Sequence, residues 1–331
     1  MPTVVTGAGG FIGSHLVERL VQRARTVTAL VRYTSDGGIG HLARLSAETM
    51  DRVSVIRGDV RDLEQMRRII GTADGVLHLA ALIGIPYSYD APRSYIDTNV
   101  LGTLNVLEAA RQHGNTMRVI VTSTSEVYGT AQTVPITEDH RLHPQSPYAA
   151  SKVGADQLAL SYHRSFGMPV VLARPFNTFG PRQSLRAVIP TIIAQLLGRD
   201  DGIVELGALS PRRDFVFVED TAEALCELLD APRDAGVEGR EFNIATGASQ
   251  SIEETARLAA ELVGKPETRL VCANERVRPA ASEVEVLEGD ATRLREAIGW
   301  APRVPLREGL QRMIDWFRER QPQQDVRGYH V

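Results

Sequence analysis

A glycine-rich turn near the amino terminus constrains the fold of this 331-residue chain more than any other feature. The segment VVTGAGGFIGSHL (4–16) spaces three glycines three residues apart, directly after a β-type run and at the start of an amphipathic helical pattern. Glycines let the backbone turn tightly and approach a phosphate, whose charge then faces the N–H groups of the helix start. A turn in this position predicts a pyrophosphate site for a dinucleotide. The predicted contacts are Gly7, Gly10, Phe11, Ile12 and Gly13.

The first half of the chain alternates short β-type runs with amphipathic helical stretches. Such alternation builds a parallel sheet with helices on both faces and right-handed crossover connections. We therefore predict an α/β fold with a Rossmann-like, doubly wound parallel sheet. The expected strands are 3–6, 27–31, 53–57, 76–79, 118–122 and 169–173, and the expected helices are 11–24, 62–70, 95–113 and 148–166.

The second half of the chain is less regular. Two of its segments, 212–229 and 241–247, begin with strand patterns and are expected to return to the sheet. A smaller α/β lobe for the substrate should therefore be interwoven with the cofactor domain. The predicted division is a dinucleotide-binding domain of residues 1–175 plus about 214–246, and a substrate-binding lobe of about 176–213 and 247–331.

The bulk composition narrows the classes of function. The chain is 43% hydrophobic and 24% charged with a net charge of −4, which is typical of a globular protein and gives no basic surface for nucleic acid. No apolar run approaches the roughly 20 residues that a membrane helix needs, and no signal peptide is evident. Cys226, Cys272 and the eight histidines lack the spacing of metal ligands. We expect a cytoplasmic protein without a bound metal.

The end of the second expected strand bears on the choice of cofactor. In dinucleotide-binding folds an acidic residue at this place holds the ribose 2′-hydroxyl and repels a 2′-phosphate. Here Val31 takes that position and Arg32 follows, and an arginine can pair with a 2′-phosphate. The sequence therefore favours NADP over NAD, unless Arg32 merely faces solvent.

A tyrosine and a lysine are the first candidates for catalysis. Tyr148 and Lys152 are four residues apart, so they share one face of the expected helix 148–166. A lysine ammonium beside the phenol should lower its pKa from about 10 towards neutrality. Tyr148 could then accept a proton from a hydroxyl while hydride leaves the same carbon.

A carboxylate stands at the end of an apolar strand. The segment TSTSEVYG (122–129) follows the run 118–121, and it places Glu126 where buried strands usually turn. Either Glu126 is a solvated turn residue or it is positioned to move a proton.

Together these motifs resemble the extended short-chain dehydrogenase/reductases that act on nucleotide sugars. Further matching segments are HLAA (78–81), DTNVLGTLNVLEAA (97–110), RPFNTFGPRQ (174–183) and RRDFVFVEDTAEA (212–224). The order Thr124, Ser125, Glu126 resembles the 4,6-dehydratases of that family, particularly those acting on UDP-N-acetylglucosamine, and also GDP-mannose 4,6-dehydratase. UDP-glucuronate decarboxylases and 4-epimerases of the same superfamily, and a non-catalytic dinucleotide-binding module, are the alternatives.

The resemblance implies a reaction sequence. Oxidation of the sugar at C4 acidifies the C5 proton, which Glu126 removes as water leaves C6. Hydride then returns to C6 and a proton returns to C5. Thr124 would bind the C4 oxygen beside Tyr148. Ser125 stands where some relatives carry an aspartic acid that protonates the leaving hydroxyl, so the general acid is either Glu126 or Ser125 acting through water.

The resemblance also implies contacts and an assembly. A homodimer would form through helices 95–113 and 148–166, where Val100, Leu104 and Leu107 recur at helical spacing. Further cofactor contacts would be Arg32, Asp59, Val60, Leu79, Ala80, Ala81, Asn99, Tyr148, Lys152 and Pro175, and contacts to the nucleotide sugar would be Thr124, Asn177, Val188, Arg213 and Arg278.

Overall fold

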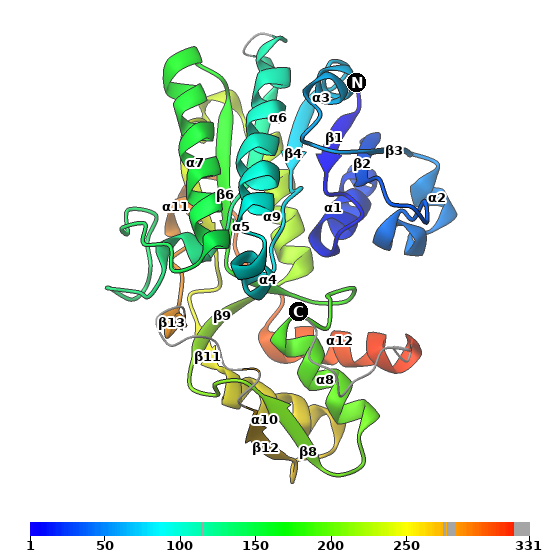
Figure 1. Cartoon of the computed structure of the whole chain (residues 1–331), viewed down its shortest axis with the longest axis vertical. Helices are drawn as coiled ribbons and strands as arrows, with labels where there is room; N and C mark the ends of the chain where they lie inside the picture. The colour runs from blue at the N-terminus through cyan, green and yellow to red at the C-terminus, as the bar shows by residue number, and fades with distance from the viewer. Residues whose placement is uncertain (114–115, 274–275, 277–282, 321–331) are drawn as a thin grey trace.

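A seven-stranded, wholly parallel sheet forms the larger part of the molecule (Figure 1). The computed structural model describes residues 1–113, 116–273, 276 and 283–320. The strand order is β10-β6-β5-β4-β1-β2-β3. All six strands expected in the first half are confirmed, and the segment 241–247 supplies the seventh. The strands are β1 (Thr3–Thr6), β2 (Val27–Arg32), β3 (Val53–Gly58), β4 (Gly75–His78), β5 (Arg118–Thr122), β6 (Val170–Pro175) and β10 (Glu241–Ile244).

Helices cover both faces of this sheet. Successive strand residues point to opposite faces, so Val5 joins the core under α1 and α9 whereas Val4 joins the core under α3, α6 and α7. The sheet is hydrophobic on both sides because each side is buried by helices. This arrangement confirms the predicted doubly wound α/β fold. The covering helices are α1 (Phe11–Gln22), α3 (Leu63–Ile70), α6 (Gly102–Arg111), α7 (Pro147–Phe166) and α9 (Val218–Asp230).

The expected continuous helix 95–113 is interrupted. The structure has α5 (Pro92–Tyr95), a π-helical segment η2 (Ile96–Leu101) and then α6. The spacing of apolar residues could not reveal this interruption. The π-helical segment contains Asn99, whose side chain makes hydrogen bonds to the distant backbone of Leu82. Leu107, expected at a dimer surface, is fully buried in the core under the sheet.

The smaller part is built on short sheets and on the helices α8, α10 and α12 (Figure 1). Strand β9 (Arg212–Phe217) was expected in the large sheet, but it pairs with β7, β11 and β13 instead. Strand β10 occupies the place beside β6, and α9 after β9 packs on α1. The remaining strands are β7 (Asn177–Phe179), β8 (Ile203–Leu206), β11 (Ser249–Ser251), β12 (Arg269–Cys272) and β13 (Val286–Leu287). The remaining helices are α2 (Ala47–Met50), α4 (Ile85–Asp90), α8 (Val188–Gly198), α10 (Ile252–Val263), α11 (Thr292–Ile298) and α12 (Leu306–Arg320).

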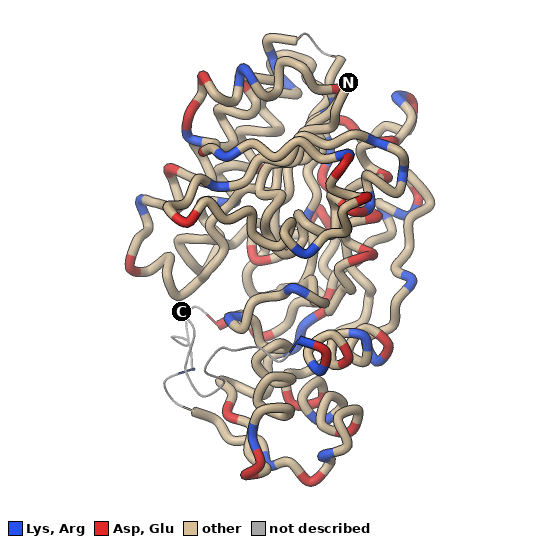
Figure 2. The backbone as a smooth tube through the Cα atoms, turned by 90° about the vertical axis from the view of Figure 1, so that its right-hand side faces the viewer, with Lys and Arg blue, Asp and Glu red and all other residues tan. Residues whose placement is uncertain are grey.

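Charged residues are interspersed along the chain rather than gathered by sign. On the side shown in Figure 2, basic and acidic positions alternate over both parts of the molecule. Within the described residues, no helix combines the length and apolar character needed to cross a membrane.

A buried ion pair joins α7 to β6. Arg174 Nε lies 3.2 Å from Asp156 Oδ2, and both side chains are almost wholly shielded from solvent. Arg174 Nη1 also donates a hydrogen bond of 3.0 Å to the Tyr128 hydroxyl. A buried charge is tolerated only with such partners. The pair therefore fixes the helix that carries Tyr148 against the sheet.

Removing the cation of this pair should be strongly destabilising. Arg174→Met leaves Asp156 buried without its partner, so we expect the free energy of unfolding to fall by about 3–5 kcal/mol. The control Arg307→Met removes an arginine whose ion pair with Glu261 is exposed, and it should change stability far less. Urea titration of both variants measures the difference. Equal stability of the two variants would contradict a structural role for the buried pair.

Candidate active site

The glycine turn leaves no room for side chains. A Cβ on Gly13 would lie 2.3 Å from the Gly7 carbonyl oxygen, and a Cβ on Gly7 would lie 2.8 Å from the Ala80 nitrogen. Gly7 also has a φ of +70°, which favours glycine. Helix α1 begins without a side-chain cap at Gly10, so its first N–H groups are available to an anion. This cradle fits the pyrophosphate of a dinucleotide.

The turn lies where the strand order reverses. Strands β2 and β3 continue from β1 in one direction, and β4, β5, β6 and β10 continue in the other. In open α/β sheets, ligands bind outside the carboxyl ends of the strands at this switch point. Leu79, Ala80 and Ala81 follow β4 at that place and are half-buried. Phe11 and Ile12 are also half-buried, and both pack against the core of the smaller part.

The end of β2 carries no carboxylate. Val31 is buried and Arg32 is exposed. Asp59, after the neighbouring strand, forms an ion pair of 2.6 Å with Arg61, and the Arg61 hydrogen bond lowers the pKa of its carboxyl. Val60 is buried against α6. A 2′-phosphate would therefore meet no acidic residue of β2 itself.

Lys152 and Tyr148 lie on the buried side of α7, facing the end of β5. Lys152 Nζ donates a hydrogen bond of 2.7 Å to the Thr122 carbonyl oxygen. The Tyr148 phenol is hydrogen-bonded to the side chain of Thr124, which lies two residues after Thr122. Its ring packs edge-on against Tyr95, with ring centroids 6.2 Å apart. The predicted catalytic residues therefore meet at one end of the sheet.

The ionisation of Tyr148 differs from the expectation. Burial raises the pKa of Tyr148, the nearby charge of Glu126 raises it further, and the hydrogen bond with Thr124 opposes both. Lys152 is itself buried, which lowers its pKa, and its ammonium is directed to Thr122. The predicted lowering by Lys152 is therefore wrong for the protein chain by itself.

Glu126 lies in a short, firmly held turn. Thr124 caps the 3₁₀ turn Ser125–Tyr128, because its hydroxyl accepts a hydrogen bond of 3.2 Å from the Glu126 N–H. Ser125 is buried, and Glu126 is half-buried close enough to Tyr148 to influence its pKa. The capped turn therefore places Glu126 near the phenol.

The turn is anchored from beneath by Tyr128. Its hydroxyl donates a hydrogen bond of 2.7 Å to Asn243 Oδ1 on β10 and accepts the one from Arg174. Gly129 then reverses the chain at a φ of +64°, where a Cβ would lie 2.1 Å from the His143 carbonyl oxygen. Sequence reasoning missed Arg174 and Tyr128. An arginine inside the apolar run 170–175 is a signal that could have pointed to a buried partner.

The residues predicted to bind the nucleotide sugar are less closely assembled. Asn177 opens β7, and its Oδ1 is buried without a hydrogen-bond partner among the described residues, so a ligand donor would satisfy it. Val188 opens α8 and is half-buried. Arg278 lies outside the described residues.

Three further predicted contacts are already engaged or buried. Arg213 is buried, with Nη1 donating to the Val284 carbonyl oxygen at 2.7 Å and Nη2 paired with Glu283 at 2.9 Å. A diphosphate at Arg213 would therefore compete with Glu283. Asn99 uses its amide on Leu82 and on α7. Pro175 is buried at the end of β6.

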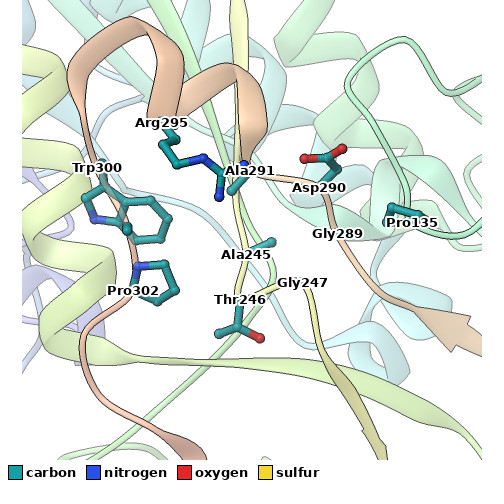
Figure 3. A pocket seen from close by; sticks show the side chains of 11 residues that line it. Pro135, Ala245, Thr246, Gly247, Gly289, Asp290, Ala291, Arg295, Trp300 and Pro302 are labelled. Carbon is teal, nitrogen blue, oxygen red and sulfur yellow. The ribbon is translucent and has the colours of Figure 1, made fainter.

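A separate cavity of about 220 Å³ lies beyond β10 (Figure 3). Backbone of Ala245–Gly247 and Gly289 lines it, and the side chains of Arg295, Asp290 and Trp300 surround it. None of the predicted site residues lines this cavity. The candidate active site is instead the group of side chains at the ends of β1, β4 and β5.

Comparison with known proteins identifies the family of this chain. The profile of the family GDP-mannose 4,6 dehydratase matches residues 4–313. A dTDP-glucose 4,6-dehydratase of Actinoplanes sp. (strain ATCC 31044 / CBS 674.73 / SE50/110) is 33% identical over 96% of this chain and 98% of its own. A UDP-glucose 4-epimerase of Mycolicibacterium smegmatis is 34% identical over 97% of this chain and 99% of its own.

A solved structure extends the comparison to a third reaction. The NAD-dependent NDP-hexosamine 5,6-dehydratase TunA, involved in tunicamycin biosynthesis, superposes with a TM-score of 0.81. It is 29% identical to this chain, and the match covers 96% of this chain and 98% of TunA. The chain therefore belongs to the extended short-chain dehydrogenase/reductase family, in the branch of NAD(P)-dependent nucleotide-sugar dehydratases and their relatives.

Proposed function

We propose that this protein is a nucleotide-sugar 4,6-dehydratase that converts an NDP-hexose to its 4-keto-6-deoxy derivative. The observation that carries the proposal is the position of Glu126, a carboxylate held in a capped turn beside the Thr124–Tyr148 hydrogen bond. Hydride transfer at C4 needs only a base for the hydroxyl proton. A second base next to the first is needed when a proton must also leave C5.

The residues have separate tasks in this reaction. Tyr148 takes the proton of the C4 hydroxyl, and Thr124 hydrogen-bonds the same oxygen. A bound nicotinamide would supply the hydride acceptor for C4 and the hydride donor for C6. Glu126 takes the C5 proton once the C4 ketone has made it acidic. Lys152 orients the site through the end of β5.

The leaving hydroxyl at C6 also needs a proton. Glu126 gains one when it removes the C5 proton, and it can pass that proton to the departing oxygen as water forms. When hydride adds to C6, a proton returns to C5 and balances the proton that Tyr148 took from the C4 hydroxyl. Ser125 has no acidic proton and its side chain is buried. We therefore assign both the base and the acid to Glu126.

Substrate, cofactor and assembly are parts of the same proposal. UDP-N-acetylglucosamine is the favoured substrate, because the segments around Glu126, Asn177 and Arg213 resemble enzymes that use it. The favoured cofactor is NADP, on the evidence of Arg32. We further propose a cytoplasmic homodimer, supported by the exposed apolar side chains of Ile96 and Leu101 beside α6 and α7.

Replacing Glu126 by glutamine removes the proposed base and keeps the size of the side chain. We expect turnover to fall by about 10²–10⁴-fold, the usual contribution of a positioned general base, while nucleotide-sugar binding is retained. Product masses are recorded with NAD or NADP and with UDP-N-acetylglucosamine, UDP-glucose, dTDP-glucose, GDP-mannose or UDP-glucuronate. The control Glu319→Gln, on the exposed end of α12, should match the unmodified protein.

Loss of one water from a neutral hexose substrate, abolished in Glu126→Gln, is the expected result. Loss of carbon dioxide from UDP-glucuronate would instead indicate a decarboxylase. A product of unchanged mass would indicate an epimerase. Cofactor binding without turnover of any sugar would indicate a binding module.

The pH dependence should report Tyr148. Burial raises the pKa of Tyr148, so the phenolate that accepts a proton becomes more abundant as the pH rises. We expect the rate to rise with pH, and Thr124→Val to move this rise to higher pH because it removes the hydrogen bond that lowers the pKa. Thr124→Ser keeps the hydroxyl and should keep the original profile. A profile that Thr124→Val leaves in place, or moves to lower pH, counts against the assignment.

The cofactor preference should depend on Arg32. A hydrogen bond to a charged group contributes about 1.5–3 kcal/mol, so Arg32→Ala should weaken NADP binding by about 10–150-fold and leave NAD binding nearly unchanged. Arg57→Ala is the matched control, because Arg57 already donates to the Gly37 carbonyl oxygen at 2.7 and 3.0 Å. Dissociation constants of both cofactors check this. Tighter binding of NAD than of NADP by the unmodified protein would refute the preference.

A further inference from the structure

A buried histidine that the proposed reaction does not use lies at the end of β4. His78 is 2% exposed and has a hydroxyl on each side of its ring. Thr6 Oγ1 lies 2.7 Å from Nδ1, and Thr103 Oγ1 lies 3.0 Å from Nε2. Neither hydroxyl carries charge, so these two contacts are not ion pairs. The burial of the ring also keeps it away from a substrate.

The surrounding hydrogen bonds fix the direction of each of these contacts. Thr6 Oγ1 already accepts from the N–H groups of Leu79 at 3.2 Å and Ala80 at 3.1 Å, so its own hydrogen is directed to His78 Nδ1. Thr103 Oγ1 donates to the Asn99 carbonyl oxygen at 2.6 Å, so it accepts from Nε2–H. Both sides require the same neutral tautomer, with hydrogen on Nε2.

Burial agrees with this state. It lowers the pKa of His78 to about 3, and the charge of Lys152 acts in the same direction. The ring is therefore uncharged throughout the neutral pH range. A protonated ring would place a second donor against the Thr6 hydroxyl, which would then have to give up one of its backbone partners.

The series of hydrogen bonds continues to the catalytic helix. Asn99 Nδ2 donates to Ser151 Oγ at 2.9 Å, and Ser151 Oγ donates to the Tyr148 carbonyl oxygen at 2.7 Å. The Asn99 amide also holds the backbone of Leu82, accepting from its N–H at 2.8 Å and donating to its carbonyl oxygen at 3.0 Å. One connected series thus joins the strand before the glycine turn, the segment 79–82 and α7.

We propose that His78 is a positioning residue, which sets the segment 79–82 and the helix of Tyr148 in register through its Nε2–H tautomer. In the proposed function, on which this inference rests, the segment lines the cofactor and the helix carries the base. The role requires a neutral ring with one donor and one acceptor, not proton transfer. A side chain that fills the same space but makes only one of the two contacts should therefore keep the fold. It should lose the correct position of the segment 79–82 or of the helix that carries Tyr148.

Asparagine and glutamine can separate the two contacts. The amide of His78→Asn lies near the place of Nδ1 and reaches only Thr6, whereas that of His78→Gln lies near the place of Nε2 and reaches only Thr103. We expect His78→Asn to lower kcat about tenfold with KM for the nucleotide sugar and cofactor affinity nearly unchanged. His78→Gln should weaken NADPH binding about tenfold, because the Thr6 contact holds the segment 79–82.

Two threonine variants break the same contacts from the other side. Thr103→Val should lower kcat at least as much as His78→Asn, because it also removes the hydrogen bond to the Asn99 carbonyl oxygen. Thr6→Val should weaken NADPH binding at least as much as His78→Gln, because it also removes the acceptor of the Leu79 and Ala80 N–H groups. The double variant His78→Asn/Thr103→Val should be no worse than Thr103→Val alone, because both changes remove the same contact between His78 and Thr103. Thr28→Val, in the neighbouring strand β2, is the control for loss of a buried threonine hydroxyl and should leave both quantities unchanged.

Nitrogen NMR of the unmodified protein supplies a readout that needs no variant and no catalysis. It should show His78 uncharged with hydrogen on Nε2 at neutral pH. Hydrogen on Nδ1, an imidazolium, or unchanged kcat and NADPH affinity in folded His78 and Thr103 variants would overturn the inference. If no nucleotide sugar is turned over, the proposed function fails, while the NMR signal and NADPH affinity still decide the role of His78.

Discussion

The hydrogen bond from Lys152 to the Thr122 carbonyl oxygen joins α7 to the end of β5, and the rest of the candidate site depends on it. A buried ammonium must find acceptors, and here the acceptor is the last residue of a central strand. This contact brings Tyr148 to the first residues after β5, where Thr124 and Glu126 lie. The buried pair of Arg174 and Asp156 holds the same helix one turn further along.

Much of this arrangement was predictable from local patterns. The strand–turn–helix unit around Gly7–Gly13 identified the fold, because a glycine turn of that spacing has few other uses. The spacing of Tyr148 and Lys152 placed them on one helix face, and Glu126 was recognisable as a carboxylate after an apolar strand. These features are local, so a single stretch of sequence contains all the information needed.

The missed features are long-range. Arg213 pairs with Glu283, 70 residues further on, and Tyr128 bonds to Asn243, 115 residues further on. The raised pKa of Tyr148 depends on burial by several elements, which the spacing of tyrosine and lysine could not reveal. The placement of β9 is likewise a long-range feature, because β10 pairs with β6 and β9 pairs with β7.

Membership of the family leaves the reaction open, because relatives of similar identity are named as a 4,6-dehydratase and a 4-epimerase. The proposed 4,6-dehydration and the alternative reactions all begin with oxidation at C4. They differ in whether C5 and C6 then react. The most direct measurement follows a nucleotide sugar that carries deuterium at C4. The account predicts a product lighter by one water with the deuterium at C6. Deuterium retained at C4, whether in an epimer or in a 5,6-unsaturated sugar, would contradict it.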